Sequence, residues 1–241
     1  MALLEAVNLS KHFGGLAAID DVSFEVAQGE RIGLIGPNGA GKTTLFNLIT
    51  GALPENQGKV IFKGKDITKM KPHQVTLEGI CRTFQLTGYF HGMTVTENIK
   101  IATLARARGA DPDTKTKEIV ELLDLGEYED LLPGQLSYGD LKRVEIGRAL
   151  ATSPELLLLD EPFSGLSISE IRDLVQRLEV VRAQGVTLLI IEHILRELMP
   201  LVDRVIVLNF GKKIAEGSPE SVVRNEEVIE AYLGREEHYA A

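Results

Sequence analysis

The early part of the chain alternates apolar and polar residues. The alternation covers residues 3–13 and 19–30, with the Gly14-Gly15 pair between them, and returns at residues 58–68. A period of two residues predicts strands that bury one face, and the glycine pair predicts a turn. We therefore expect these stretches to form a small antiparallel sheet.

Other segments are apolar throughout and are separated by stretches with helical periodicity. Such runs predict parallel strands that helices cover on both faces, and therefore an α/β fold. The helical period between about residues 88 and 135 predicts a helical insertion, with Thr96 as a candidate N-cap. The apolar runs lie at residues 31–36, 156–161, 186–193 and 204–211.

Composition narrows the classes of protein that fit this fold. The 241 residues carry a formal net charge of −9, so the chain as a whole would be repelled by a nucleic acid, and we expect no nucleic-acid partner. The single cysteine, Cys81, cannot form an internal disulfide, which fits a reducing cytoplasmic setting. No apolar run reaches the roughly 18 residues that span a membrane, so we expect membrane association only through a partner.

A glycine-rich loop follows the first apolar run and precedes a helical pattern. Gly36, Gly41, Lys42 and Thr43 meet the spacing G-x-x-x-x-G-K-[ST], in which backbone N–H groups converge on phosphate oxygens. Lys42 would reach the β- and γ-phosphates, and the Thr43 hydroxyl would ligate Mg²⁺. We expect a nucleotide to bind at Gly36, Asn38, Gly39, Ala40, Gly41, Lys42, Thr43 and Thr44.

Two carboxylates follow the second apolar run. Asp160 and Glu161 come directly after four leucines, and ligands bind at the carboxyl ends of the strands in a parallel sheet. Asp160 suits the shell of Mg²⁺, while Glu161 can reach the water that attacks the γ-phosphate. Acidic residues also cap helices after buried strands, but beside the glycine loop this pair indicates a nucleotide-hydrolysing site.

The first of two further segments indicates a dimer that shares nucleotides between subunits. Ser137 and Gly139 lie just before an amphipathic helix, whose N-terminus favours an anion. One fold does not usually need a second anion site for one γ-phosphate, whereas such a dimer does. His193 follows the third apolar run, at the edge expected for Asp160 and Glu161, and could donate to the γ-phosphate and hold the attacking water.

With these pieces in order, nearly the full chain resembles the ATP-binding subunit of ABC transporters. Residues 36–43 resemble the Walker A motif of that family, residues 156–161 its Walker B motif and residues 136–140 its signature motif. Gln85 resembles the glutamine of the Q-loop. Phe13 is placed like the aromatic residue that stacks on adenine.

The resemblance implies a role for each of these residues in ATP hydrolysis. Thr43, Gln85 and Asp160 would surround Mg²⁺, and Gln85 would also serve catalysis. Glu161 would be the catalytic carboxylate, and His193 the switch histidine that steadies the γ-phosphate. ATP and Mg²⁺ are the expected cofactors.

The same resemblance implies a P-loop NTPase (RecA-like) core with an N-terminal antiparallel β subdomain and a helical insertion subdomain. Residues 216–241 would form a C-terminal helix and tail. The expected boundaries are 1–30 and 55–70 for the β subdomain, 31–54, 71–87 and 150–215 for the core, and 88–149 for the helical subdomain.

The family also implies partners. Each subunit carries half of two composite sites, so this chain should pair with a second ATPase subunit, either a copy or a sister chain, with ATP between them. Opening and closing would pull on integral membrane permease subunits docked near Gln85, on the inner face of the cell membrane. An extracytoplasmic substrate-binding protein would take part indirectly.

Several short sequence segments resemble the branched-chain amino acid importers of the LivG type, among them residues 13–24 and the AYLG segment at residues 231–234. The related subunit of lipopolysaccharide export shares several of these segments and is an alternative. Two departures from the family pattern concern the dimer contacts. Tyr138 and Asp140 replace the first glycine and the glutamine of the common signature L-S-G-G-Q, and Ser167 stands where the D-loop commonly has aspartate.

Two other classes of protein remain as alternatives. A soluble ABC ATPase of translation or DNA repair would usually carry two cassettes or long coiled-coil insertions, whereas this chain shows one cassette and a short insertion. A small-molecule kinase would need an acceptor pocket in place of the signature helix that begins near Ser137. Steady phosphate release without a small acceptor would distinguish the kinase from an ATPase.

Overall fold

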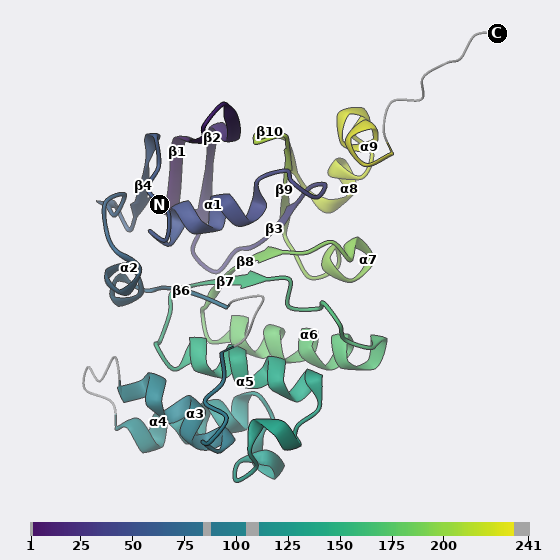
Figure 1. Cartoon of the computed structure of the whole chain (residues 1–241). Helices are drawn as coiled ribbons and strands as arrows, with labels where there is room; N and C mark the ends of the chain where they lie inside the picture. Colours follow the sequence, from purple (N-terminus) through teal and green to yellow (C-terminus); the bar gives the residue numbers. More distant parts are fainter. Residues whose placement is uncertain (1, 84–87, 105–110, 234–241) are drawn as a thin grey trace, which may run out of the picture. The chain divides into compact units, whose positions relative to one another are not determined.

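The chain divides into two compact units, one formed by Met1–Lys71 with Leu189–Ala241 and the other by Pro72–Leu188. The structure is a computed structural model and describes residues 2–83, 88–104 and 111–233. Helices and strands alternate in both units (Figure 1), which confirms the α/β prediction. The subdomain boundaries expected from the family remain a prediction.

The first unit contains an antiparallel sheet with the strand order β2-β1-β4-β5. β1 and β2 are joined by the turn at residues 14–15. Buried and more exposed positions alternate over Leu4–Val7 and Val22–Ala27, and shifts in the β1–β2 register interrupt the alternation elsewhere. The period-two pattern of the sequence is thereby confirmed. The strands are β1 (Ala2–Phe13), β2 (Leu16–Ala27), β4 (Gln57–Phe62) and β5 (Lys65–Asp66).

The first unit also contains parallel strands built from the continuous apolar runs. β3 pairs in parallel with β9, with Ile32 opposite Arg204 and Ile35 opposite Val207. β10, which the sequence did not predict, returns antiparallel beside β9. These elements are β3 (Arg31–Ile35), β9 (Arg204–Asn209), β10 (Lys212–Gly217), α1 (Lys42–Ile49), α7 (Leu195–Leu198), α8 (Pro219–Val222) and α9 (Glu226–Leu233).

The second unit combines a short parallel pair with a group of helices. β6 (Ile80–Arg82) pairs in parallel with β7 (Leu156–Asp160), whose five residues are all buried. Helices α3 to α6 pack together (Figure 1), which confirms the helical insertion. β8 (Thr187–Ile191) spans the boundary between the units. The helices are α2 (Pro72–Glu78), α3 (Val95–Leu104), α4 (Pro112–Leu122), η1 (Gly126–Tyr128), η2 (Pro133–Gln135), α5 (Tyr138–Leu150) and α6 (Ile168–Ala183).

The start of α3 corrects the predicted N-cap. Thr94, and not Thr96, caps the helix: its Oγ1 accepts the N–H of Glu97 at 3.3 Å, and the Glu97 carboxylate accepts the N–H of Thr94 at 2.8 Å. Thr96 lies inside the helix, and its hydroxyl donates to the carbonyl of Glu129. The reciprocal bonds form a capping box, whose T-x-x-E pattern is present in the sequence.

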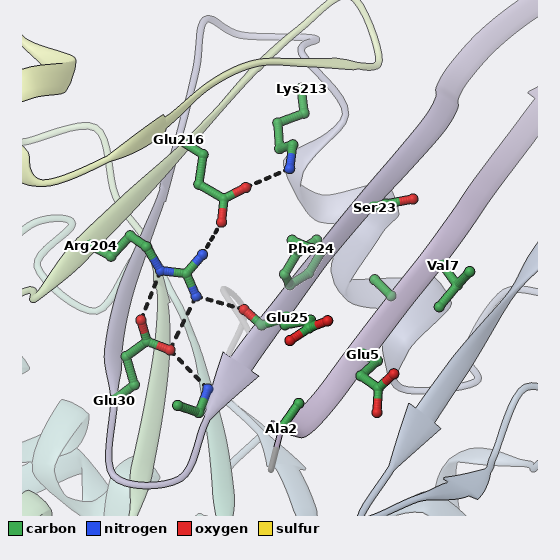
Figure 2. Close-up of a pocket in the computed structure, with 12 residues that line it drawn as sticks. Ala2, Glu5, Val7, Ser23, Phe24, Glu25, Glu30, Arg204, Lys213 and Glu216 are labelled. Atoms are coloured by element: carbon green, nitrogen blue, oxygen red, sulfur yellow. Dashed lines mark hydrogen bonds and ion pairs between the residues drawn. The ribbon is translucent and has the colours of Figure 1, made fainter.

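Arg204, the first residue of β9, connects three other segments of the first unit (Figure 2). Its Nε donates to Glu30 Oε1 at 2.7 Å, its Nη2 donates to the carbonyl oxygen of Glu25 at 2.6 Å, and its Nη1 donates to Glu216. The hydrogen bond to Glu30 is the main reason that the pKa of Arg204 is raised. The four residues line a groove of about 750 Å³. Their hydrogen bonds join β2, the turn after it and β10 to β9.

We predict that Arg204→Met lowers the free energy of unfolding by about 2–3 kcal/mol, because several charge-assisted hydrogen bonds are lost and the part-buried carboxylate of Glu30 loses its cationic partner. Urea unfolding of the full chain measures this change. The matched control is Arg196→Met, which removes an exposed arginine paired with its neighbour Glu197 and should change stability by less than about 0.5 kcal/mol. Equal effects of the two substitutions would contradict the prediction.

Candidate active site

The glycine loop runs from the end of β3 to the start of α1 in the first unit. The backbone at Gly36 has a φ of 151°, and a side-chain carbon there would lie 2.1 Å from the carbonyl oxygen of Leu208. At Gly41, with a φ of 104°, such a carbon would lie 2.4 Å from the carbonyl oxygen of Ala18. Both contacts are far too short for any side chain, so only glycine fits at these two positions.

This loop encloses the ammonium group of Lys42. Lys42 is buried, and its Nζ donates to the carbonyl oxygens of Gly36 at 2.6 Å and Pro37 at 3.1 Å. Thr43 follows in the first turn of α1 and is exposed. The predicted nucleotide-binding residues of this segment therefore share one loop and one helix start: Gly36, Asn38, Gly39, Ala40, Gly41, Lys42, Thr43 and Thr44.

Phe13 ends β1 with 49% of its surface exposed, so it is not the core residue that an isolated aromatic on a strand usually is. The ammonium group of Lys11 lies 5.3 Å from the centroid of its ring. An exposed aromatic face suits stacking against a flat ring such as adenine. That role remains a prediction.

Asp160 ends β7 in the second unit and is 4% exposed. Its Oδ2 lies 2.5 Å from Nη2 of Arg82, and its backbone N–H donates to Thr83 Oγ1 at 3.2 Å. Sequence analysis did not single out Arg82. The available signal was a basic residue at the end of an apolar stretch, three residues before Gln85.

Glu161 follows Asp160 with a backbone φ of 49°. A glutamate rarely adopts this left-handed conformation, and such strained residues cluster at functional sites. The next residue, Pro162, begins the turn that leads towards α6. The geometry is therefore compatible with the catalytic role predicted for Glu161.

His193 follows β8 in the first unit, and its backbone is hydrogen-bonded to the side chain of its neighbour Glu192. The Glu192 carboxylate is fully buried and accepts the backbone N–H groups of His193 at 3.0 Å and Ile194 at 3.3 Å. The His193 Nδ1 lies 3.8 Å from the same carboxylate oxygen, and the His193 side chain is 55% exposed. Glu192 thus holds the backbone of His193 in place. Glu192 was not identified from the sequence, although it is a charged residue at the end of an apolar run.

The signature segment of the second unit has carboxylates at the start of its helix. Ser137 is the N-cap of α5: its Oγ accepts the N–H of Asp140 at 3.1 Å and donates to Asp140 Oδ2 at 2.7 Å. A side-chain carbon at Gly139 would lie 2.9 Å from Oε1 of Glu170, which stands on α6. Hydrogen bonds from Ser167, and from the Gly139 amide, lower the pKa of Glu170.

Carboxylates of the chain itself therefore lie at the N-terminus of α5, where the helix dipole favours negative charge. The nucleotide contact expected of Ser137 and Gly139 stays a prediction. The departures from the family pattern take part: Asp140 accepts from Ser137, and Ser167 forms a capping box with Glu170. Glu170 was not identified from sequence, since its contact with Gly139 joins residues that are distant along the chain.

The donors available for Mg²⁺ fit that ion. In the described ranges no three His, Cys, Asp or Glu side chains gather into a metal cluster. Mg²⁺ does not need one, because it is commonly held by one or two carboxylates together with substrate phosphates. Asp160 offers such a carboxylate in the second unit, and Thr43 offers a hydroxyl oxygen in the first unit. Gln85, the third predicted ligand, lies outside the described residues.

Two protein-family models match this chain. The ABC transporter family model matches residues 19–164, which include the glycine loop, the signature segment and both carboxylates. A second family model, the branched-chain amino acid ATP-binding cassette transporter, matches residues 212–238. No helix in the described part of the chain is long and apolar enough to cross a membrane.

Two curated relatives are similar over nearly their full length. The lipopolysaccharide export system ATP-binding protein LptB of Haemophilus influenzae is 37% identical, over 98% of this chain and 99% of the relative. The probable branched-chain amino acid transport ATP-binding protein LivG of Methanocaldococcus jannaschii is 37% identical, over 97% of this chain and 98% of the relative.

Solved structures share the same fold. A crystal structure of the ADP conformation of an ATP-binding cassette of an ABC transporter is 36% identical, with a TM-score of 0.89 over 98% of this chain and 100% of that one. A dimeric bacterial ABC transporter cassette is 25% identical, with a TM-score of 0.79 over 90% and 98%. The predicted fold class and the predicted ATPase activity are confirmed. The chain therefore belongs to the ATP-binding cassette family of ABC transporters and is an ATPase subunit of such a transporter.

Proposed function

We propose that this subunit powers the import of branched-chain amino acids. The observation that carries the proposal is the match of residues 212–238 to the C-terminal family of branched-chain amino acid cassettes. This segment covers β10, α8 and α9, which lie after the nucleotide motifs and so distinguish among cassettes that share the motifs. The likeness to a LivG protein supports the same substrate class.

A second candidate is the export of lipopolysaccharide or a related lipid. It is favoured by the LptB relative, which is as similar to this chain as the LivG relative. The candidates share one ATPase mechanism and differ in the membrane partners and in the direction of transport. Partner identity therefore decides between them.

In the proposed mechanism, the loop amides and Lys42 hold the phosphates of ATP, and Phe13 stacks on adenine. Thr43, Asp160 and Gln85 are the residues that would hold Mg²⁺, which neutralises phosphate charge when it is bound. The Lys42 ammonium donates to two carbonyl oxygens of the loop, and in this mechanism it turns from them towards a phosphate.

Hydrolysis in this proposal depends on Glu161 and His193. Glu161 accepts a proton from the attacking water, because its carboxylate follows directly after the residue that approaches the metal. His193 donates to the γ-phosphate, and the buried Glu192 keeps its backbone in place. Gln85, which lies outside the described residues, would be a further ligand of the metal and would also serve catalysis.

We further propose that two ATPase subunits close on two ATP molecules, with Ser137 and Gly139 of each facing the glycine loop of the other. The chain contributes one copy of each motif, which is half of each composite site. The second subunit would be either a copy of this chain or a sister chain. The dimer would dock on permease subunits at the cytoplasmic face of the membrane, and a substrate-binding protein would act on the other side. We propose no nucleic-acid partner, because the net charge of −9 would repel a phosphate backbone.

For Glu161→Gln we predict that ATP binding persists while phosphate release falls about a hundredfold or more, since the amide cannot accept the proton of water. A persistent ATP-bound dimer should appear in gel filtration. Glu179→Gln makes the same change from carboxylate to amide at a half-exposed position of α6; it serves as the control and should keep normal turnover. Normal turnover of Glu161→Gln would remove Glu161 from its proposed role.

For Lys42→Ala we predict that nucleotide affinity falls roughly tenfold or more, because a charge-assisted contact with phosphate is lost. Titration with a fluorescent ATP analogue measures the affinity. The exposed Lys117→Ala controls for the loss of one positive charge. An unchanged affinity of the Lys42 variant would contradict the proposed phosphate site.

The transport assignment predicts which proteins accompany this chain when it is purified from gently solubilised membranes. We expect two permeases, a sister ATPase and an amino-acid binding protein, identified by mass spectrometry. Loss of the chain should also abolish the matching high-affinity uptake of labelled leucine. Recovery of lipid-export permeases would instead reverse the proposed direction, and recovery of no integral membrane protein would support a soluble ABC ATPase.

A further inference from the structure

The hairpin of β9 and β10 lies directly against the glycine loop. The backbone N–H of Gly211, in the turn between the two strands, donates to the carbonyl oxygen of Ala40 at 3.0 Å. Gly36, at the start of the loop, lies so close to the carbonyl oxygen of Leu208 that no side chain fits between them. The loop is therefore held against this hairpin at two positions, and all of these residues belong to the first unit.

The last described helix, α9, covers this hairpin. α9 packs on β10, and Figure 1 shows it on that side of the sheet. Asn225 precedes the helix, and its Oδ1 accepts the N–H of Val228 at 3.2 Å. Val228 is buried, and Tyr232 follows four residues later, so the two side chains lie on the same face of α9.

Tyr232 reaches the first glycine of the loop. The backbone N–H of Gly36 donates a hydrogen bond to the phenol oxygen of Tyr232. Burial raises the pKa of the Tyr232 phenol, and this hydrogen bond opposes the rise. The carbonyl oxygen of the same glycine accepts the ammonium group of Lys42 at 2.6 Å. Gly36 therefore joins Tyr232 of α9 to Lys42 of α1.

The position of Tyr232 along the chain adds a second reason to examine this contact. Tyr232 belongs to the AYLG segment at residues 231–234 and to the region matched by the branched-chain cassette family, residues 212–238. None of the nucleotide motifs lies in this region. The contact with Gly36 nevertheless brings the region to the start of the glycine loop.

We propose that Tyr232 is a positioning residue of the nucleotide site, which holds the backbone of Gly36 through its hydroxyl and keeps the glycine loop ordered for phosphate. Glycine has more backbone freedom than any other residue, so an external hydrogen bond restricts it effectively. A loop that is already ordered loses less entropy when the nucleotide binds, and the affinity is higher. This inference rests on the proposed role of the loop as the phosphate site.

The test compares the nucleotide affinity of Tyr232→Phe with that of the unmodified full chain, by titration with a fluorescent ATP analogue. Phenylalanine keeps the ring and removes only the hydroxyl. We expect the affinity to fall about threefold to tenfold, the range for one lost hydrogen bond, while kcat at saturating ATP stays nearly the same. Leu233→Ala shortens an exposed side chain of the same helix, and Tyr128→Phe removes a hydroxyl from the second unit; both should leave the affinity unchanged.

The second readout is the hydrogen exchange of the Gly36 amide, followed by NMR in the nucleotide-free full chain. We expect Tyr232→Phe to accelerate the exchange at Gly36 several-fold, because the acceptor of that N–H is gone. The amide of Gly33, inside β3, should exchange at its original rate. A tyrosine that only stabilised the fold would not change Gly36 selectively.

An unchanged nucleotide affinity of Tyr232→Phe, or an unchanged exchange rate at Gly36, would overturn the inference. Lys42→Ala separates this failure from failure of the proposed function: if that variant also binds nucleotide normally, the proposed phosphate site is wrong. Should Tyr232→Phe fold poorly, the unmodified chain decides, because its Gly36 amide must exchange more slowly than the amide of the exposed Gly39. Equal rates at the two glycines would also overturn the inference.

Discussion

The contact of the glycine loop with two neighbouring carbonyl groups constrains the rest of the first unit. Gly36 lies against the carbonyl of Leu208 on β9, and Gly41 lies against the carbonyl of Ala18 on β2, both closer than a side chain permits. The loop is therefore held between β9 and the antiparallel sheet. This placement fixes where α1 begins and hence where Lys42 and the phosphate-facing amides lie.

Buried charge imposes a second constraint, because each ionised group in the interior requires a partner of its own chain. Lys42 is held by carbonyl oxygens, Glu192 by backbone N–H groups and Asp160 by Arg82. The partners differ in kind. A carbonyl or an amide can be replaced by solvent or by a phosphate with little rearrangement, whereas Arg82 brings a full charge that opposes a second cation.

Much of the fold could be predicted because periodicity is a local property of the sequence. The period-two stretches became β1 and β2, and the apolar runs became β3, β7, β8 and β9. β10 escaped prediction because Lys212–Gly217 is short, polar at its start and lies at the edge of β9. The predicted N-cap Thr96 was wrong although the T-x-x-E box that begins at Thr94 can be read in the sequence, so the signal was present and was overlooked.

Part of the candidate site could not be predicted from local sequence patterns. Motif spacing identified the residues proposed to touch nucleotide, whereas Arg82, Glu170 and Glu192 act on those residues from elsewhere. Arg82 and Asp160 are 78 positions apart, so no spacing rule relates them. Glu192 adjoins His193, but only the fold reveals that its carboxylate is fully buried and bound to backbone amides.

In the proposed mechanism, nucleotide binding exchanges these internal partners for external ones. Lys42 would leave two carbonyl oxygens for phosphate, and the helix N-terminus beside Ser137, which already meets Asp140, would accept a phosphate from the other subunit. An exchanged hydrogen bond contributes far less net free energy than a new one. The consequence is a dimer that closes on ATP and can still open after hydrolysis, because no single contact stabilises the closed form by a large amount.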